Sequence, residues 1–210
     1  MDQVMQRNDM LESTLEKDGV FDRRQAVGLL LADRKDALVV TGLGSPSYDV
    51  FAAGDHDGNF YLWGAMGAAA LLGMGLALAQ PTRPVIVITG DGEQLMGLGG
   101  LATIAVSRPD NLSIVLLDNG HFGETGMQKS HAGLGIDLAI VTRAIGFPVA
   151  KTLRNEADLL QARSEFLARG NGPRFYRIPI HAENLPRALP ARDGVYVKNR
   201  FRAHLGFQVS

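Results

Sequence analysis

Asp91 and Asn119 are the residues whose types and positions most directly suggest chemistry. Each follows a largely apolar segment, Asp91 shortly after residues 85–89 and Asn119 shortly after residues 112–117. A carboxylate and an amide oxygen together suit a hard cation such as Mg2+, which takes few protein ligands and completes its shell with water and phosphate oxygens. The sequence therefore predicts a magnesium site, provided that the fold brings these two side chains together.

A strand–helix–strand unit would bring them together. Residues 85–89 and 112–117 are typical of buried strands, and the apolar residues between them are typical of a helix. Two parallel strands joined by a crossover helix end at the same edge of the sheet, where open α/β sheets bind ligands. Gly90 and Gly92 allow a sharp turn and a close approach of the backbone to a ligand. The alternative is an ordinary unit of this kind with an acid in its turn.

The same alternation of strands and helices continues along the chain. We predict one α/β domain over residues 22–182, a doubly wound, mostly parallel six-stranded sheet with helices on both faces. Residues 1–21 are expected to form an N-terminal arm, and residues 183–210 a tail that packs on the domain or on a partner. The expected strands cover residues 37–41, 59–62, 85–89, 112–117, 149–152 and 173–180, and the expected helices residues 23–34, 47–53, 68–79, 93–107, 138–146 and 156–169.

Composition narrows the class of protein. The 210 residues, 46% apolar and 20% charged, are typical of one soluble globular domain. A net charge of -1 argues against recruitment by nucleic acid or anionic lipid. The chain has no cysteine, which excludes disulfides and thiolate metal sites, and we expect no signal peptide and a cytoplasmic location. The uncharged segment 63–79 could imitate a membrane span, but its Gly and Ala content favours a helix packed on a sheet.

A second glycine-containing turn follows the first expected strand. Gly44 and Ser45 lie between the strand at residues 37–41 and the helix at residues 47–53. Backbone N–H groups at the start of a helix can bind a phosphate. A turn without a ligand fits these residues equally well.

The sequence Gly90-Asp91-Gly92, followed later by Asn119, resembles the signature of thiamine diphosphate (ThDP) enzymes. The resemblance implies that Asp91 and Asn119 hold the Mg2+ that bridges the diphosphate, with the main-chain carbonyl of His121 as the third protein ligand. The residue before the asparagine ligand is usually another asparagine in that family, whereas here it is an aspartate. In this arrangement the glycine turn and the first amides of the following helix, at Gly92 and Glu93, would face the diphosphate.

A second resemblance to the same family lies at Gly64-Ala-Met-Gly67, after the expected strand at residues 59–62. It implies that the Gly64 carbonyl accepts a hydrogen bond from the aminopyrimidine of the cofactor. Met66 would lie under the cofactor and bend it. The alternative for Met66 is an ordinary core methionine that fills a gap.

The loop that begins after the second metal ligand is rich in ionisable side chains. His121, Glu124 and His131 could donate protons to, or accept them from, a bound 2-oxo acid. Thr125 and Gln128 could act as neutral hydrogen-bond donors. For any single residue a solvated loop side chain is the alternative, but together they predict the rim of the substrate site.

The resemblance covers roughly residues 23–180 and corresponds to the diphosphate-binding (PP) domain alone. It is nearest to the PP half of phosphonopyruvate and sulfopyruvate decarboxylases, and the segment from Leu116 to Gln128 carries this likeness. Such enzymes also need a pyrimidine-binding (PYR) domain that presents a glutamate to the cofactor. The resemblance therefore implies a lyase, the PP-domain (beta) subunit of a ThDP- and Mg2+-dependent 2-oxo acid decarboxylase, active with a PYR-domain (alpha) subunit in an α2β2 assembly.

Two other functions remain compatible with these motifs. The chain could belong to a ThDP-dependent carboligase or an oxidative acyl-transfer enzyme. It could also be a cofactor-binding subunit without turnover of its own, although the presence of both Asp91 and Asn119 argues against that.

Overall fold

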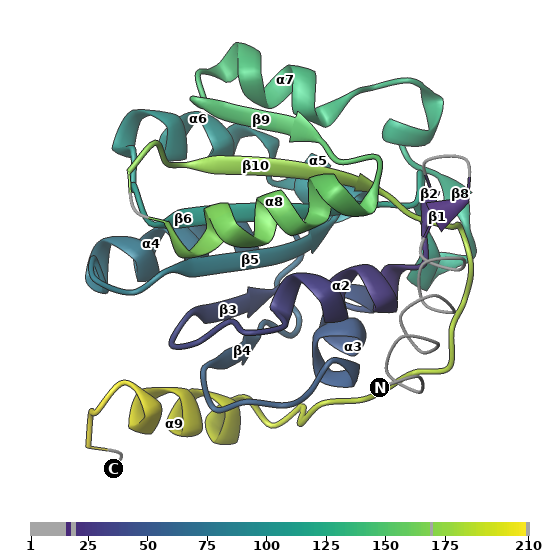
Figure 1. Ribbon diagram of the computed structural model, residues 1–210. Coiled ribbons are helices and arrows are strands. Elements are labelled where there is room, and N and C mark those ends of the chain that lie inside the picture. The colour runs from purple at the N-terminus through teal and green to yellow at the C-terminus, as the bar shows by residue number, and fades with distance from the viewer. Residues whose placement is uncertain (1–15, 18–19, 169, 209–210) are drawn as a thin grey trace, which may run out of the picture.

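A six-stranded parallel sheet forms the centre of the molecule (Figure 1). The computed structural model describes residues 16–17, 20–168 and 170–208. The strands lie in the order β4-β3-β5-β6-β10-β9, and every neighbouring pair is parallel. This confirms the predicted doubly wound α/β fold. The strands are β3 (Leu38–Thr41), β4 (Asn59–Tyr61), β5 (Val85–Gly90), β6 (Leu112–Asp118), β9 (Val149–Thr152) and β10 (Arg174–Pro179).

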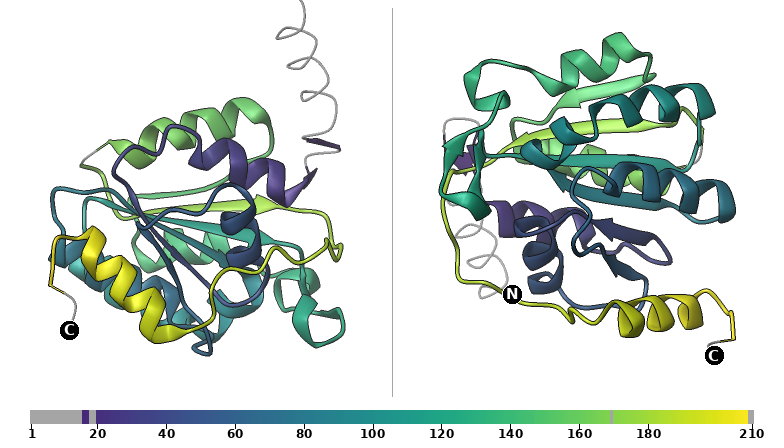
Figure 2. Two further views of the ribbon diagram at one scale, coloured as in Figure 1. Left: turned by 90° about the horizontal axis from the view of Figure 1, so that it is seen from below. Right: turned by 180° about the vertical axis from the view of Figure 1, so that it is seen from behind.

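Helices cover both faces of this sheet (Figures 1 and 2). One face packs against α2 (Arg23–Leu31), α3 (Ser45–Ala52) and α8 (Glu156–Leu167). The other packs against α4 (Ala69–Ala79), α6 (Leu98–Ser107) and α7 (Leu138–Ile145). The central strands are buried on both sides because their alternate side chains supply two separate cores. In β5, for example, Ile86 and Ile88 belong to the first core and Val85 and Val87 to the second.

The chain uses side-chain caps where the sequence predicts helix starts. Asp22 accepts a hydrogen bond from the Gln25 N–H, and Asp137 accepts two from the first turn of α7. Gly146 ends α7 in the left-handed conformation that glycine adopts most readily.

The Gly- and Ala-rich segment forms α4, which lies close to the sheet. A Cβ at Gly73 would lie 2.2 Å from a methyl carbon of Val87, so only glycine allows this approach. No helix in the described part of the chain combines the length and apolar character needed to cross a membrane.

The single helix expected over residues 93–107 is instead two helices. The first, α5 (Asp91–Met96), ends at Gly97, and α6 follows directly. A Cβ at Gly97 would lie only 2.1 Å from the Gly67 carbonyl oxygen. The prediction of one helix was wrong at this point because the close approach of the Gly67 turn, which is distant in sequence, bends the chain here.

The polar loop after β6 contains a small hairpin of β7 (His121–Phe122) and β8 (Gln128–Lys129). Short 3-10 turns at Gly123–Thr125 and Ala132–Leu134 complete it. Of the expected N-terminal arm, residues 1–15 and 18–19 lie outside the described residues. Its described part is β1 (Glu16–Lys17) and β2 (Val20–Phe21), which pair with each other.

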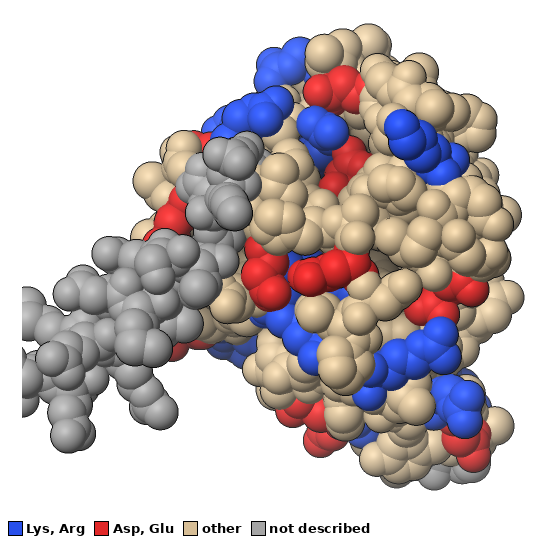
Figure 3. Space-filling view, turned by 90° about the vertical axis from the view of Figure 1, so that its right-hand side faces the viewer, with Lys and Arg blue, Asp and Glu red and all other residues tan. Residues whose placement is uncertain are grey.

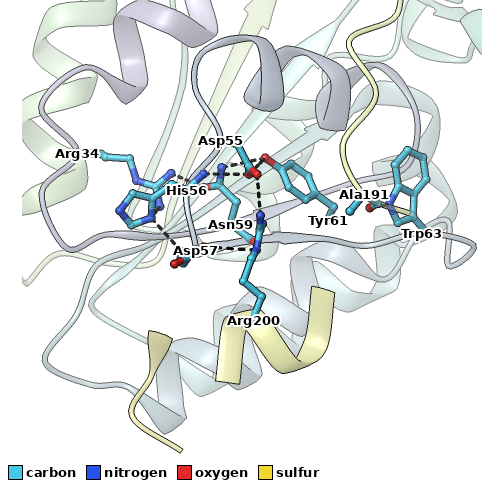
Figure 4. A network of polar contacts seen from close by, with 10 residues as sticks. Arg34, Asp55, His56, Asp57, Asn59, Tyr61, Trp63, Ala191 and Arg200 are labelled. Atoms are coloured by element: carbon cyan, nitrogen blue, oxygen red, sulfur yellow. Dashed lines mark hydrogen bonds and ion pairs between the residues drawn. The ribbon is translucent and has the colours of Figure 1, made fainter. Parts of the chain in front are cut away.

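The C-terminal segment runs along the domain and ends in a helix that the sequence interpretation missed, α9 (Gly194–His204). Trp63 donates its indole N–H to the Ala191 carbonyl at 3.0 Å, just before this helix begins (Figure 4). Phe201 of α9 packs edge-on against Phe60 of β4, with ring centroids 5.5 Å apart. The helix therefore lies beside an edge strand of the sheet.

A polar network fastens α9 to the amino-terminal side of β4 (Figure 4). Arg200 of α9 pairs with Asp55 at 2.6 Å, and Asp55 accepts the Tyr61 hydroxyl hydrogen at 2.8 Å. His56 lies in the same turn, with its ring centroid 5.2 Å from that of His204. This network lies at the opposite end of the strands from Asp91 and Asn119.

Candidate functional site

A cleft of about 240 Å³ opens at the carboxyl ends of β3, β5 and β6. The strand that follows β3 in the sequence, β4, lies on one side of it, and the next strand, β5, lies on the other side. Open α/β sheets bind ligands at such a switch point in the strand order. Figure 3 faces this edge of the sheet and shows acidic side chains gathered near its middle, with basic ones beside them. Turns after all three strands line the cleft, together with Arg23, Met66, Met96 and Ile180.

Asp91 lies in the wall of this cleft, at the start of α5, and is only 2% exposed. The Ser130 hydroxyl donates a hydrogen bond to its carboxylate. Burial raises the pKa of Asp91 to about 6, and the nearby Asp118 carboxylate acts in the same direction. A cation in the cleft would stabilise the charged form of this buried carboxylate.

Asn119, at the end of β6, lines the same cleft. Its side-chain oxygen accepts the His121 N–H at 2.9 Å, which holds the turn in place. The His121 ring, also in the cleft wall, has its Nδ1 2.7 Å from the Asn119 carbonyl oxygen. The three residues predicted for the metal, Asp91, Asn119 and His121, are thus brought to one cleft.

The glycine turn of Gly90 and Gly92 also lines the cleft. A Cβ at Gly92 would lie 2.5 Å from the Phe122 ring, so the absence of a side chain lets Phe122 pack against the turn. The turn that begins α5 therefore packs directly against the Phe122 ring in the cleft wall.

Glu93 lies in the cleft wall but is 4% exposed, and its carboxylate points to the backbone. Its Oε2 accepts the Leu43 N–H at 3.0 Å, and a Cβ at Gly42 would lie 1.6 Å from that oxygen. Burial raises the pKa of Glu93. The side chain therefore ties the turn after β3 to α5.

The turn at Gly44 and Ser45 begins α3. Gly44 has a φ of 76°, a conformation that favours glycine, and Ser45 lines the cleft. Glu124 lies over this turn, because a Cβ at Gly44 would lie 2.9 Å from the Glu124 Cγ. Arg187 pairs with Glu124 at 3.0 Å. Glu124 is therefore a cleft residue, and the C-terminal segment reaches the cleft rim through Arg187.

Met66 lines the cleft and remains 40% exposed, so it is not a core methionine. Gly64, two residues earlier, has a φ of 73° and open space where a Cβ would be. It does not itself line the cleft wall.

Some of the loop residues expected at the substrate rim lie outside the cleft. His131 is exposed and is not part of the lining, because the chain there turns into the short 3-10 segment Ala132–Leu134. Gln128 is exposed and exchanges hydrogen bonds with Thr125 at 3.0 and 2.8 Å. Thr125 is in the lining.

Among the residues in or beside the cleft, Ser130, Phe122 and Arg23 are polar or aromatic side chains that sequence reasoning did not find. Ser130 and Phe122 contact the Asp91 turn from the loop, and Arg23 reaches the cleft from the first turn of α2. For Arg23 a signal was present: a positive charge in the first turn of a helix is electrostatically unfavourable, which suggests a role other than helix formation.

Comparison with known proteins gives consistent similarities. The model for the family "Thiamine pyrophosphate enzyme, C-terminal TPP binding domain" matches residues 52–178. Sulfopyruvate decarboxylase subunit beta of Methanothermobacter thermautotrophicus is 36% identical over 87% of this chain and 94% of its own length. Phosphonopyruvate decarboxylase of Streptomyces viridochromogenes is 38% identical over 86% of this chain, but the match spans only 45% of that protein.

Solved structures show the same fold. A ThDP-dependent 4-hydroxybenzoylformate decarboxylase from Rhodococcus jostii superposes with a TM-score of 0.68 at 23% identity. The superposition covers 81% of this chain and 34% of that one. The present chain therefore corresponds in length to a separate subunit of one relative and to a part of larger relatives.

Proposed function

The chain belongs to the thiamine pyrophosphate enzyme family, and from this we propose that it is the beta subunit of a ThDP- and Mg2+-dependent 2-oxo acid decarboxylase. The observation that carries the proposal is the match over 94% of a relative named as a beta subunit of such an enzyme. The cleft supports it, because Asp91, Asn119 and Met66 all line one pocket at the switch point of the sheet.

The residues present fit the metal and the diphosphate. We propose that Mg2+ is held by the Asp91 carboxylate, the Asn119 side-chain oxygen and the His121 carbonyl. Within the described residues no cluster of three His, Asp or Glu side chains forms a metal site. A cation with few protein ligands, which completes its shell from phosphate and water, suits this donor set.

The diphosphate itself would lie between two helix starts. We propose that the amides of Gly44 and Ser45, on one side, and of Gly90, Gly92 and Glu93, on the other, bind its oxygens. Both turns line the cleft or flank it, and helix N-termini favour anions. Gly64 would offer its carbonyl to the pyrimidine, and Met66 would support the bend of the cofactor.

When bound, the cofactor would supply a cationic thiazolium ring as the acceptor for the electron pair released with carbon dioxide. The chain's own residues bind and orient the reactants and shield them from water. We propose that His121 and Glu124, both in the cleft lining, hold or transfer protons at the substrate. His131 lies outside the lining, so a role for it in proton transfer would require the loop to move.

A partner chain is the remaining component. The cleft is small for an enclosed cofactor site, since such pockets usually have volumes of about 300–1,000 Å³. Two apolar side chains of its lining are exposed, Met66 by 40% and Met96 by 65%. We propose that a PYR-domain (alpha) subunit covers the rim of the cleft and supplies the glutamate to the cofactor, in an α2β2 assembly.

The relatives' names also suggest the substrate class. We propose a small 2-oxo acid with a second anionic group, such as a sulfonate or a phosphonate. Carboligation and oxidative acyl transfer remain the alternative outcomes, and the product of the reaction decides between them.

The test combines the purified chain, saturating ThDP and Mg2+, and a panel of 2-oxo acids, with and without the PYR-domain subunit. We expect carbon dioxide release only when both subunits are present. Identification of the second product separates simple decarboxylation, which gives an aldehyde, from carboligation or acyl transfer. Decarboxylation by this chain alone, at a rate that the partner does not raise, would contradict the proposal.

A further inference from the structure

Arg23 is a buried cation in the wall of the cleft. It is the first residue of α2 and is only 3% exposed, yet it lines the same cleft as Ser45, Pro46 and Asp91. Arginine is almost never buried to this degree unless it is paired. An arginine buried at this position therefore needs an anionic partner.

Asp49 of α3 supplies only part of that partner. The Arg23 Nε lies 3.3 Å from Asp49 Oδ2, within range of an ion pair. The geometry does not give a hydrogen bond, and among the described residues neither of these two buried atoms has a hydrogen-bond partner. Asp49 is also shared, because Arg24 Nε lies 3.4 Å from its other oxygen.

The charges around Asp49 do not balance. Two guanidinium groups face one fully buried carboxylate, and burial raises the pKa of Asp49 to about 6 despite both cations. Arg24 is partly solvated and also donates to the Pro186 carbonyl. Arg23 has neither compensation, because it is buried and its Nε has no hydrogen-bond partner among the described residues.

Helix electrostatics add to this imbalance. The N-terminus of α2 carries a partial positive charge, and apart from the Asp22 cap, whose carboxylate accepts the Gln25 N–H, no acidic residue lies in its first turn. An arginine there is unfavourable for the helix itself. An anion in the cleft would offset both the incomplete pairing of the buried guanidinium and its unfavourable place at a helix N-terminus. It would pair with a guanidinium that is already desolvated and held in place.

We propose that Arg23 binds an oxyanion of the ligand in this cleft and that Asp49 positions it. Its neighbours in the lining, Ser45 and Pro46, begin α3, so the terminal phosphate of the cofactor is one source of that anion. The second anionic group of the substrate is the other. Only this choice rests on the proposed function; the presence of an anion site does not.

The test uses the full chain and two simple probes, inorganic pyrophosphate for the cofactor and methylphosphonate for the substrate. Calorimetry at low salt measures the dissociation constant of each. We expect Arg23→Met to weaken the binding of at least one probe by roughly tenfold or more, since a hydrogen bond to a charged group is lost. The matched control is Arg24→Met, which removes the neighbouring charge from Asp49 and should change both constants less than about threefold.

Arg23→Lys provides a second variant if Arg23→Met does not fold, as judged by its thermal unfolding. It keeps the charge but loses the planar fork of donors, so an intermediate loss of a few-fold is expected. Weaker pyrophosphate binding assigns Arg23 to the cofactor, and weaker methylphosphonate binding alone assigns it to the substrate. Unchanged affinity for both probes in a folded Arg23 variant, or no binding of either by the unaltered chain, would overturn the proposal. Neither binding measurement requires turnover. A failure of the decarboxylase assay would therefore contradict the proposed function without contradicting the anion site at Arg23.

Discussion

Ser130 and Asp91 illustrate how one hydrogen bond can orient a proposed metal ligand. They are 39 residues apart in the sequence, and the loop after β6 carries the serine back to the start of α5. The hydroxyl is fully buried and also accepts the Gly133 N–H at 3.3 Å. The serine therefore holds one oxygen of the carboxylate that we propose as a metal ligand.

We predict that Ser130→Ala weakens Mg2+-dependent ThDP binding by about two- to thirteenfold, the range that follows from one lost hydrogen bond of about 0.5–1.5 kcal/mol. Asp91→Asn, which removes the charge itself, should have a larger effect. Calorimetric titration of the assembled subunits with ThDP at several Mg2+ concentrations provides the measurement. The control is Ser164→Ala on the exposed face of α8, which should bind normally. If Ser130→Ala binds as tightly as the control, the serine does not orient the ligand.

For single residues, the sequence was sufficient to identify those cleft residues whose positions follow from local spacing along the chain. Asp91 and Asn119 follow apolar strands directly, so the parallel sheet alone places them at one edge. Ser130, Arg23 and Phe122 could not be identified in this way. Their contacts with the cleft depend on how a loop folds back and how α2 packs, which no short sequence pattern specifies.

Among the elements, the junction of α5 and α6 links the two glycine motifs. Gly97 ends α5, and its Cα lies against the Gly67 carbonyl of the turn that carries Met66. A displacement of either turn must therefore move the other. This contact fixes the position of Met66 relative to Asp91.

We predict that Gly97→Ala destabilises the chain by about 1–3 kcal/mol, because the new Cβ would lie 2.1 Å from a backbone oxygen that has little freedom to move. It should also weaken ThDP binding, through the shifted Met66 turn. Gly99→Ala, two residues later on the exposed side of α6 with nothing within 4 Å of its Cβ, is the matched control. It should be neutral or slightly stabilising, since alanine favours a helix over glycine by up to about 1 kcal/mol. Denaturant unfolding of both variants measures the difference, and equal stabilities would contradict the steric argument.

The six strands were predictable because each is a short segment that contains apolar residues and is bounded by turn signals, and the order of strands and helices followed from the same alternation. The break at Gly97 was not, because a helical pattern continues through it. Helix α9 was also missed, since its basic and aromatic residues do not form a clear apolar stripe and only Val197 and Phe201 are buried. Its Asp193 cap, which accepts from Val195 and Tyr196, was a signal that could have been used.

For the whole molecule, the attachment of α9 connects the tail to the end of the sheet opposite the cleft. His56 lies between Arg34, 3.3 Å from its Nδ1, and His204 of α9. Burial lowers the pKa of His56 below its ordinary value of 6.5, and Arg34 and His204 act in the same direction. Asp57 and Asp55 oppose this shift. The neutral imidazole is therefore the form that the folded state favours.

We predict that the attachment of α9 weakens as the pH falls below about 6.5, where the unfolded turn takes up a proton more readily than the folded one. The stabilisation is present above that pH and is lost as the pH falls through the depressed pKa of the folded state. Trp63, the one tryptophan in the sequence, bonds to Ala191 beside α9, so its fluorescence reports the attachment. The difference between the unaltered chain and His56→Gln isolates this group from the other titrating residues. Identical pH profiles for the two would show that His56 has no part in it.

The position of α9 beside β4 also has a consequence for biosynthesis. An edge strand of a parallel sheet exposes unpaired backbone groups, which can pair with other chains during folding. The ribosome completes β4 well before Phe201 and Arg200, which pack against its side. Nascent chains must therefore carry this side of the sheet uncovered until α9 has been made, and chaperone contact during that interval would be most valuable at β4.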